Sequence, residues 1–477
     1  MLQVGGTRKC RASCGFGLCL INMLTAGSTG YNLSVNIPRC AETFNPPPPP
    51  SVSVMSALVL IDLTYGCCPA CTGESLREES ESGSRVFLLC GERYRNSNNI
   101  SNLSSCSSSS SSSSSNGRKS ACVLDSASTA ESLYRFKETL DQLDQSSVRV
   151  ITSPRGRQVL QMYQQLLFTA VYTFEYKVVD LTCASCTQSA HKDSPDDVEE
   201  DVTAFVRQLP ALRGELRVLR STLIPECFGH GFSTRGGGVS SIPTMSSLNL
   251  FSSRRRRDPI AVVTENRRRL ALHAGFPSEQ FRLVKVNHAS DVWVLGKEEP
   301  ESYDAMVTNQ TGVVIAAPGA DCMPILFADP VAKVVGVAHA GWKGTLMGVA
   351  MATVEAMVRE FGCRVSDILV AVGPSVGACC FTLVRDQALD FHSIHPDCVP
   401  DLESEMPHVN IRLANRLLLQ CGGVLPENIH DDTVTARPSV TPCTSCHPEL
   451  FFSHRRDGME FGTQVGNLWI RETGTRA

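Results

Sequence analysis

The stretch GADCMPILFADPVAKVVGVAHAGWKG, residues 319–344, contains two apolar runs separated by a short turn. The apolar runs Met323–Phe327 and Lys333–Ala338 predict two β-strands. We expect these strands to face each other across the turn ADPVAK. After them, Gly344–Phe361 repeats apolar residues with a helical period and ends at Gly362, which predicts a helix. The stretch therefore indicates a mixed α/β domain with substantial sheet.

Three side chains that can bind a metal occur in or near this stretch. His288, Cys322 and His339 lie in the segments VNHASD, PGADCMP and VAHAGWKG, each of which is rich in small residues. A catalytic zinc takes three nitrogen, sulfur or oxygen ligands and keeps an open position, where it lowers the pKa of a bound water to about 7. No close pair such as C-x-x-C anchors the three. Three buried polar residues without a metal therefore remain an alternative reading.

The residues beside these candidates favour a site. His339 lies where a predicted strand ends and a helix begins, and Cys322 follows Asp321 at the end of a glycine-containing run. Functional residues are common in loops at the ends of elements. Gly341 and Gly344 would let the backbone approach a ligand, and the following helix would present its N-terminal amides to an anion.

Strand-like and helix-like runs also alternate over residues 56–187, which predicts a smaller N-terminal α/β domain. We expect a serine-rich insert at 93–119, and a disordered or doubtful N-terminal extension at 1–55 that ends in a proline run. Residues 188–222 are expected to form an acidic linker and a helix, and residues 223–477 the larger domain. The elements expected in the two domains are strands at 57–63, 86–90, 148–152, 281–287, 304–309, 312–317 and 368–372, and helices at 132–143, 157–171, 202–209 and 259–275.

Composition excludes several classes of partner. The net charge of −4 gives no general attraction to nucleic acid or anionic lipid. The basic run Arg254–Arg257 is expected to be a solvated loop, with a localisation or phosphate-binding patch as the alternative. No apolar run approaches the roughly 18 to 20 residues that span a bilayer. The 21 cysteines are scattered over 477 residues and form no dense module, which favours a reducing, cytoplasmic location.

Several ordered motifs after Leu223 together resemble the laccase-domain, or polyphenol-oxidase-like, family of purine nucleoside phosphorylases. The resemblance is greatest to vertebrate members that carry an additional N-terminal domain. It implies that His288, Cys322 and His339 bind a zinc ion, with Asn287 where relatives often have another residue. The motifs that carry it are HGFSTRGGGVS, NHASD, YDAMVTNQTGV, GADCMPILFADP, GVAHAGWKGT, GPSVGACCF and CTSCHPELFFSHRRDG.

The resemblance implies a zinc enzyme that acts on small purine nucleosides. It would cleave adenosine, inosine, guanosine and methylthioadenosine with phosphate as co-substrate, and would deaminate adenosine to inosine. Cys322 and His339 would act at the metal. Arg235, with the amides of Gly236–Gly238, and Lys343 are the predicted phosphate ligands, because arginine and glycine-rich amides suit that anion. Asp321 would move a proton beside the metal or, alternatively, cap the backbone.

Two other functions are alternatives to this one. A copper polyphenol oxidase needs many imidazoles, but the chain has 11 histidines and no His-x-His pair, so copper is not expected. A non-catalytic protein of immunometabolism would act through its N-terminal domain, for which we expect a protein partner in either case. The location associated with the family is the cytoplasm, with the nucleus, peroxisome or endoplasmic reticulum as further sites. The string Cys443–His447 matches a haem-attachment motif, which we interpret as accidental.

Overall fold

The computed structural model describes residues 58–65, 78–79, 81–90, 121–179 and 194–472. The described residues all belong to one compact unit, residues 56–477. The predicted N-terminal extension and serine-rich insert lie outside the described residues. The predicted boundaries of the two α/β domains stay predictions. None of the described helices has both the length and the apolar character to span a membrane.

The N-terminal part of this unit contains a five-stranded parallel sheet in the order β3-β2-β1-β4-β5. Apolar side chains on one face of β1 and β2 pack against helices that follow in the sequence. This arrangement confirms the predicted alternation of strands and helices. The elements are β1 (Leu58–Asp62), β2 (Arg85–Leu89), β3 (Cys122–Leu124), α3 (Thr129–Gln142), β4 (Ser147–Thr152), α4 (Pro154–Leu167), β5 (Thr173–Val178) and α6 (Pro195–Gln208).

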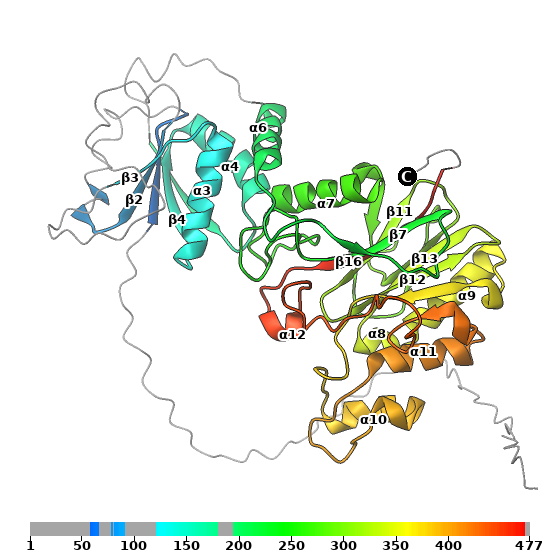
Figure 1. The fold of residues 1–477 in the computed structure, drawn as a ribbon. Coiled ribbons are helices and arrows are strands. Elements are labelled where there is room, and N and C mark those ends of the chain that lie inside the picture. Colours follow the sequence, from blue (N-terminus) through cyan, green and yellow to red (C-terminus); the bar gives the residue numbers. More distant parts are fainter. Residues whose placement is uncertain (1–57, 66–77, 80, 91–120, 180–193, 473–477) are drawn as a thin grey trace, which may run out of the picture. The chain divides into compact units, whose positions relative to one another are not determined.

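Two mixed sheets form the larger part of the unit (Figure 1). The first has the order β15-β14-β12-β13-β10-β9 and the second β6-β7-β16-β11-β8. The first sheet contains β9 (Val292–Val294), β10 (Ala305–Thr308), β12 (Met323–Asp329), β13 (Val334–Ala340), β14 (Leu369–Val372) and β15 (Ile429–His430). The second contains β6 (Val218–Leu219), β7 (Phe228–Ser233), β8 (Phe281–Leu283), β11 (Val314–Gly319) and β16 (Gln464–Ile470).

The predicted hairpin is confirmed, and it forms the centre of the six-stranded sheet. Strand β12 pairs antiparallel with β13, from Met323 opposite Ala340 to Asp329 opposite Val334. All seven residues of each strand are buried, because the sheet is covered on both faces. This double burial explains why β12 is a continuous apolar run rather than an alternating one.

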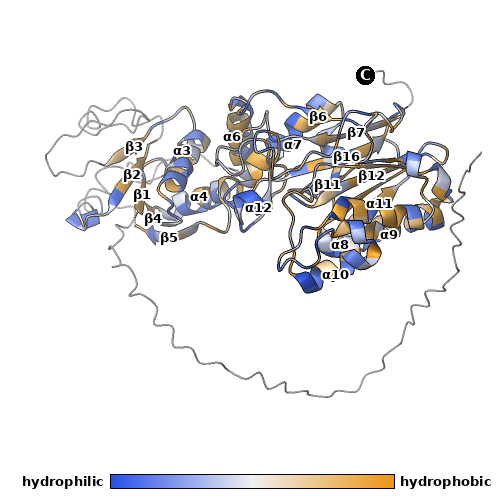
Figure 2. Cartoon of the chain, turned by 60° about the horizontal axis from the view of Figure 1, so that its bottom comes forward, coloured by the Kyte–Doolittle hydropathy of each residue, from blue (hydrophilic) through white to orange (hydrophobic). Residues whose placement is uncertain are grey.

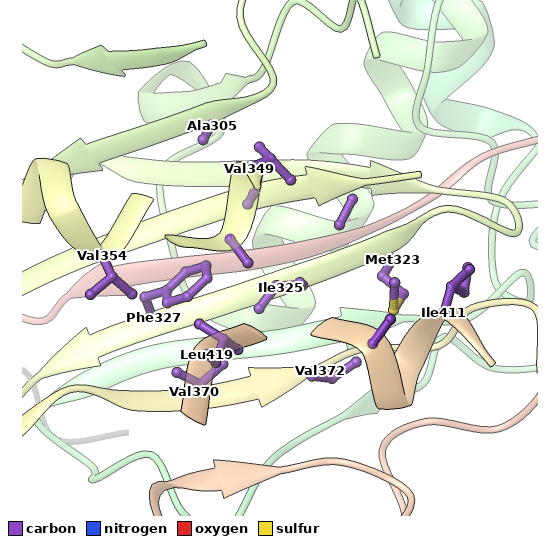
Figure 3. Packing of buried hydrophobic residues seen from close by; sticks show 14 of the residues in the cluster. Ala305, Met323, Ile325, Phe327, Val349, Val354, Val370, Val372, Ile411 and Leu419 are labelled. Carbon is purple, nitrogen blue, oxygen red and sulfur yellow. The ribbon is translucent and has the colours of Figure 1, made fainter. Parts of the chain in front are cut away.

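Side chains alternate between two cores along β12. Ile325 and Phe327 pack against helices on one face, whereas Leu326 and Ala328 pack against the five-stranded sheet. Figure 3 shows the first core, with Phe327 among side chains from strands and helices. The helices are α7 (Ile260–Ala274), α8 (Trp342–Leu346), α9 (Val349–Phe361), α10 (Arg385–Ile394), α11 (Ile411–Cys421) and α12 (His454–Asp457).

The larger part therefore has four layers. Helices α9 and α11 cover the six-stranded sheet, the two sheets pack face to face, and α7 covers the outer face of the five-stranded sheet. Helices α9 and α11 carry both apolar and polar residues, as expected for helices with one buried face (Figure 2).

Two predictions about helices were wrong in their extent. The helix expected at 344–361 is divided into α8 and α9 by Gly348, whose φ of 79° is left-handed. The acidic stretch expected to be a linker begins α6 instead. Ser194 and Asp197 form a reciprocal capping box there, and two acidic residues in the first turn suit the helix dipole.

Candidate metal centre

His288, Cys322 and His339 converge at one end of the central hairpin. Their ligand atoms all lie within 4.8 Å of one another. Cys322 comes directly before β12, and the pairing of Pro324 with His339 brings that histidine beside it. His288 comes from the loop after β8. We call these three residues the metal trio. His339 is only 4% exposed, whereas His288 is exposed, so the trio faces solvent on the His288 side.

The buried carboxylate of Asp304 holds the two histidines of the trio. Its Oδ1 accepts hydrogen bonds from Nδ1 of His339 (2.8 Å) and from the backbone N–H of His288 (3.1 Å). Its Oδ2 accepts from the N–H groups of Asn287 and Ala289. Burial opposes ionisation of the carboxyl, but these hydrogen bonds keep the pKa of Asp304 below its usual value. Because an ionised carboxylate only accepts, His339 carries its proton on Nδ1 and leaves Nε2 for a metal.

A tight turn directs the ring of His288 toward His339. His288 has a φ of 64°, which is uncommon for a residue with a side chain. The side chain of Asn287 closes the turn by accepting a hydrogen bond from the N–H of Ala289 at 3.1 Å. The two imidazole rings lie 5.1 Å apart at an angle of 84°. Asn287 therefore shapes the loop that presents His288 to the trio.

Gly341 leaves room for the trio. A Cβ atom at this position would lie 2.9 Å from Sγ of Cys322 and 3.7 Å from Cδ2 of His288. Its φ of −78° is open to any residue, so this close approach, and not the backbone conformation, requires glycine. That Gly341 lets the backbone approach a ligand stays a prediction.

The metal-free trio favours a thiolate beside an imidazolium. Burial alone would raise the pKa of Cys322, but the charge of His339 and hydrogen bonds from both histidines lower it to about 6. Burial alone would lower the pKa of His339, but the Cys322 thiolate and Asp304 raise it to about 9. A metal that binds Nε2 would displace the imidazolium proton, so metal binding is coupled to proton release.

The Asp321 side chain joins the trio to the C-terminal loop. Its Oδ1 accepts hydrogen bonds from the hydroxyls of Thr444 and Ser453, both at 2.7 Å. Its Oδ2 accepts from the backbone N–H of Arg455 at 2.6 Å, at the start of α12. The bond from Arg455 caps the backbone, which is one of the two alternatives predicted for this residue. A role in proton transfer stays a prediction.

Arg235 is buried, with 3% of its surface exposed, and donates to the protein itself. Nε, Nη1 and Nη2 donate to the carbonyl oxygens of Ser246, Pro448 and Pro243. The guanidinium also lies 4.8 Å from the ring centroid of Phe452. Burial lowers the pKa of Arg235 to about 10. The side chain thus joins segments from both ends of the larger part of the unit.

The other predicted phosphate ligands differ in their availability. The N–H of Gly237 donates to the carbonyl of Leu212, and the N–H of Gly238 donates to the hydroxyl of Ser247. Lys343 is exposed, and its ammonium lies 5.3 Å from the ring centroid of Trp342. Among the residues that the structure describes, no carboxylate forms an ion pair with Lys343. It is therefore the predicted phosphate ligand with the most freely accessible donors.

The basic run Arg254–Arg257 does not act as one patch. Arg256 lies 3.7 Å from the ring centroid of Phe461 and donates to its carbonyl, and Arg257 pairs with Asp141 at 3.2 Å. Only Arg254 and Arg255 are exposed. The prediction of a wholly solvated loop was therefore wrong for its second half.

Sequence reasoning missed Asp304 as part of the site. It was assigned only to a strand, because its contact with His339 arises from the pairing of β10 with β13. One signal was available. An aspartate directly before the buried strand Ala305–Thr308 needs hydrogen-bond donors, and those donors are the loop amides beside His288.

Comparison with known families places this geometry in context. A family model described as multi-copper polyphenol oxidoreductase laccase matches residues 229–471, which include the whole trio and Asp304. The chain belongs to this laccase family. The resemblance inferred from its motifs is thereby confirmed.

Curated relatives of this laccase-family chain carry names from purine metabolism. It is 52% identical over 358 residues to purine nucleoside phosphorylase LACC1 of Mus musculus, covering 72% of this chain and 80% of the relative. It is 49% identical over 360 residues to the protein of that name from Homo sapiens, covering 73% and 82%. Adenosine deaminase RL5, from an unknown prokaryotic organism, is 32% identical over 254 residues, covering 50% and 92%.

One solved structure also matches about half of the chain. YlmD from Geobacillus stearothermophilus is 31% identical, covers 53% of this laccase-family chain and 94% of its own, and has a TM-score of 0.47.

The metal trio of this laccase-family member suits one ion of a borderline-soft metal. Its donors are two imidazole nitrogens and one thiolate, and Asp304 supplies the carboxylate that commonly supports a metal-bound histidine. Within the described ranges, only one group of potential ligands contains histidine. This donor set differs from the imidazole-rich sites of multicopper proteins, although the family description includes copper.

Proposed function

We propose that this protein is a zinc-dependent purine nucleoside phosphorylase that also deaminates adenosine. The observation that carries the proposal is the metal trio held by Asp304, within a domain whose relatives are named for these reactions. Phosphorolysis would join a phosphate oxygen to C1′ and break the bond from C1′ to the purine, releasing base and ribose 1-phosphate. Deamination would replace the 6-amino group with oxygen from water and release ammonia.

His288, Cys322 and His339 would hold the zinc ion. When bound, zinc would supply a Lewis acid that lowers the pKa of a water molecule toward neutrality. Asp304 would keep His339 in the tautomer that the ion requires, and the exposed side of the trio near His288 would receive the nucleoside. The substrates proposed are adenosine, inosine, guanosine and methylthioadenosine.

Lys343 is our first candidate for the phosphate ligand, because its ammonium is exposed and close in sequence to His339. Arg235 is the second, although three of its donors are engaged by carbonyl oxygens. Replacing each residue distinguishes a role in phosphate binding from a role in stabilising the fold. Lys343→Met should raise the KM for phosphate without changing the melting temperature, whereas Arg235→Lys should lower the melting temperature because it removes bonds that join distant segments.

The function is tested by incubating the purified protein with adenosine, with and without phosphate, and identifying the products by chromatography. We expect adenine and ribose 1-phosphate only with phosphate, and inosine with or without it. Cys322→Ala should abolish both product sets, and Cys421→Ser, at an exposed cysteine on α11, is the control. Unchanged turnover in Cys322→Ala would refute catalysis at the trio.

A copper oxidase remains the second candidate because the family description names that chemistry. Metal analysis of the active protein and oxygen uptake with a phenol distinguish the two. We expect zinc and no oxygen uptake. Stoichiometric copper with phenol turnover would overturn the proposal. The cytoplasmic location and a protein partner of the N-terminal domain stay predictions.

A further inference from the structure

Four cysteines gather at a second place in the larger part of the unit. Cys379 and Cys380 lie in the loop after β14, and Cys443 and Cys446 lie in the loop before α12. Their Sγ atoms all lie within 4.8 Å of one another. We call these residues the cysteine cluster. None of them belongs to the metal trio, and the proposed purine chemistry does not use them.

The distances within the cluster fit four thiolates around one ion. Sγ of Cys446 lies 3.6 Å from Sγ of Cys379 and 3.3 Å from Sγ of Cys380. Zinc–sulfur bonds of about 2.3 Å in a tetrahedron put the sulfur atoms about 3.8 Å apart. A disulfide would need about 2.05 Å. The observed separations are therefore close to those of a metal site and too long for a disulfide.

Backbone contacts bring the two loops together independently of the sulfur atoms. Ser375 pairs with Cys443 as an isolated β-bridge, and the N–H of Thr444 donates to the carbonyl of Ser375 at 3.0 Å. The N–H of Gly377 donates to Sγ of Cys443 at 3.3 Å, a contact that stabilises a thiolate. The loops thus hold the cysteines in place before any ion arrives.

We propose that Cys379, Cys380, Cys443 and Cys446 bind a zinc ion of their own in a closed, structural tetrathiolate site. Four sulfur ligands leave no open position, which separates this site from a catalytic one. The thiols would lose their protons to solvent when the ion binds. The C-x-x-C within residues 443–446, which we interpreted as an accidental haem motif, is then one half of the ligand set.

The site would fasten the loops that surround Asp321. Thr444, between two of the ligands, donates its hydroxyl to Asp321, and the N–H of Val376 donates to the carbonyl of Asp321. Asp321 directly precedes Cys322 of the metal trio. An ion in the cysteine cluster would therefore stabilise the backbone that positions a trio ligand, without contacting substrate.

Zinc content of the purified full-length protein tests the site. Cys379→Ser/Cys446→Ser should bind one zinc fewer per chain than the wild type, and so should Cys322→Ala. The two changes combined should leave no zinc, and Cys421→Ser should bind as much as the wild type. Wild-type zinc content in Cys379→Ser/Cys446→Ser would overturn the proposal.

X-ray absorption of the zinc in Cys322→Ala provides a test that does not require changing the cluster. We expect a shell of sulfur atoms alone at about 2.3 Å, because only the tetrathiolate site remains loaded. A shell that contains nitrogen or oxygen would contradict the proposal, as would a disulfide between cluster cysteines in freshly purified, zinc-loaded protein. The measurement requires that Cys322→Ala empties the trio, which the loss of one zinc per chain checks, but it does not use nucleoside turnover. Its result is therefore independent of the proposed activity.

Discussion

At the residue scale, the metal trio depends on a side chain that is not itself a ligand. Asp304 uses both carboxylate oxygens to hold one histidine by its ring and the other by its backbone. A ligand loop and a ligand strand from distant parts of the sequence are thereby fixed to one buried charge. Supporting carboxylates of this kind fix the tautomer and the orientation of a metal-binding histidine.

Asp304→Asn should weaken zinc binding by about 10- to 100-fold, the usual range for a supporting carboxylate. An NH2 group replaces one carboxylate oxygen, and it cannot accept hydrogen bonds from the N–H groups that surround Asp304. Competition with a chelator measures the affinity. The matched control is Asp329→Asn, since Asp329 is also buried and accepts from two backbone amides, but in the β12–β13 turn. Equal losses in both variants would contradict a specific role for Asp304.

The thiol of Cys322 should ionise with a midpoint near pH 6 in metal-free protein, because the pKa is lowered to about 6. An ordinary cysteine titrates near about 8.5. Its alkylation by iodoacetamide, followed by mass spectrometry of the peptide, should therefore stay fast as the pH falls from 8 to about 6.5 and slow only near pH 6. A midpoint in the ordinary range would show that the two histidines do not stabilise the thiolate.

At the element scale, the break between α8 and α9 shapes the region after His339. Gly348 is left-handed with a φ of 79°, and no neighbour would contact a Cβ there. The short α8 can thus follow the trio in one direction while α9 packs on the sheet in another. The only cost of a side chain at this position is conformational.

Gly348→Ala should lower the free energy of unfolding by about 1 to 2 kcal/mol, the cost of a left-handed residue with a Cβ. Gly348→Asn should cost less, because asparagine tolerates this conformation. Urea denaturation of both variants measures the difference. An alanine variant as stable as the wild type would mean that α8 and α9 can join into one helix.

At the scale of the whole molecule, strand β12 joins the two sheets of the larger part of the unit to the layer of helices formed by α9 and α11. Because β12 is buried on both faces, its side chains connect the helical layer to the second sheet. Cys322 and His339 lie at one end of this doubly covered hairpin, so the most strongly packed part of the fold also positions the site.

Phe327→Ala should lower the free energy of unfolding by about 3 to 5 kcal/mol, as is usual when a fully buried phenylalanine leaves a cavity. Phe327 has no exposed surface. Val331→Ala, in the turn of the same hairpin, is the control, since its side chain is 68% exposed and should change stability by less than about 0.5 kcal/mol. Denaturant unfolding compares them. If Phe327→Ala lowered the free energy of unfolding as little as Val331→Ala does, Phe327 would not be part of the main core.

Local patterns predicted the central hairpin and the alternation of strands and helices in the N-terminal part. These features depend on the spacing of apolar residues that are close in sequence. The three residues of the trio were also predicted from their chemistry and surrounding motifs, and the structure brings them together. Asp304 and strand β16 were not, because each depends on pairing with a distant strand. The cysteine cluster likewise required two loops about 60 residues apart to meet.

The two ends of the central hairpin differ in whether they tolerate added residues. Pro324 pairs with His339 beside the trio, whereas the turn at 330–333 lies at the opposite end of the two strands. A single residue added within either strand would reverse the faces of the side chains beyond it, but a residue added in the turn would not. The exposed Val331 is therefore a natural entry point for a peptide tag or a fluorescent reporter. A label there would leave the metal ligands in register.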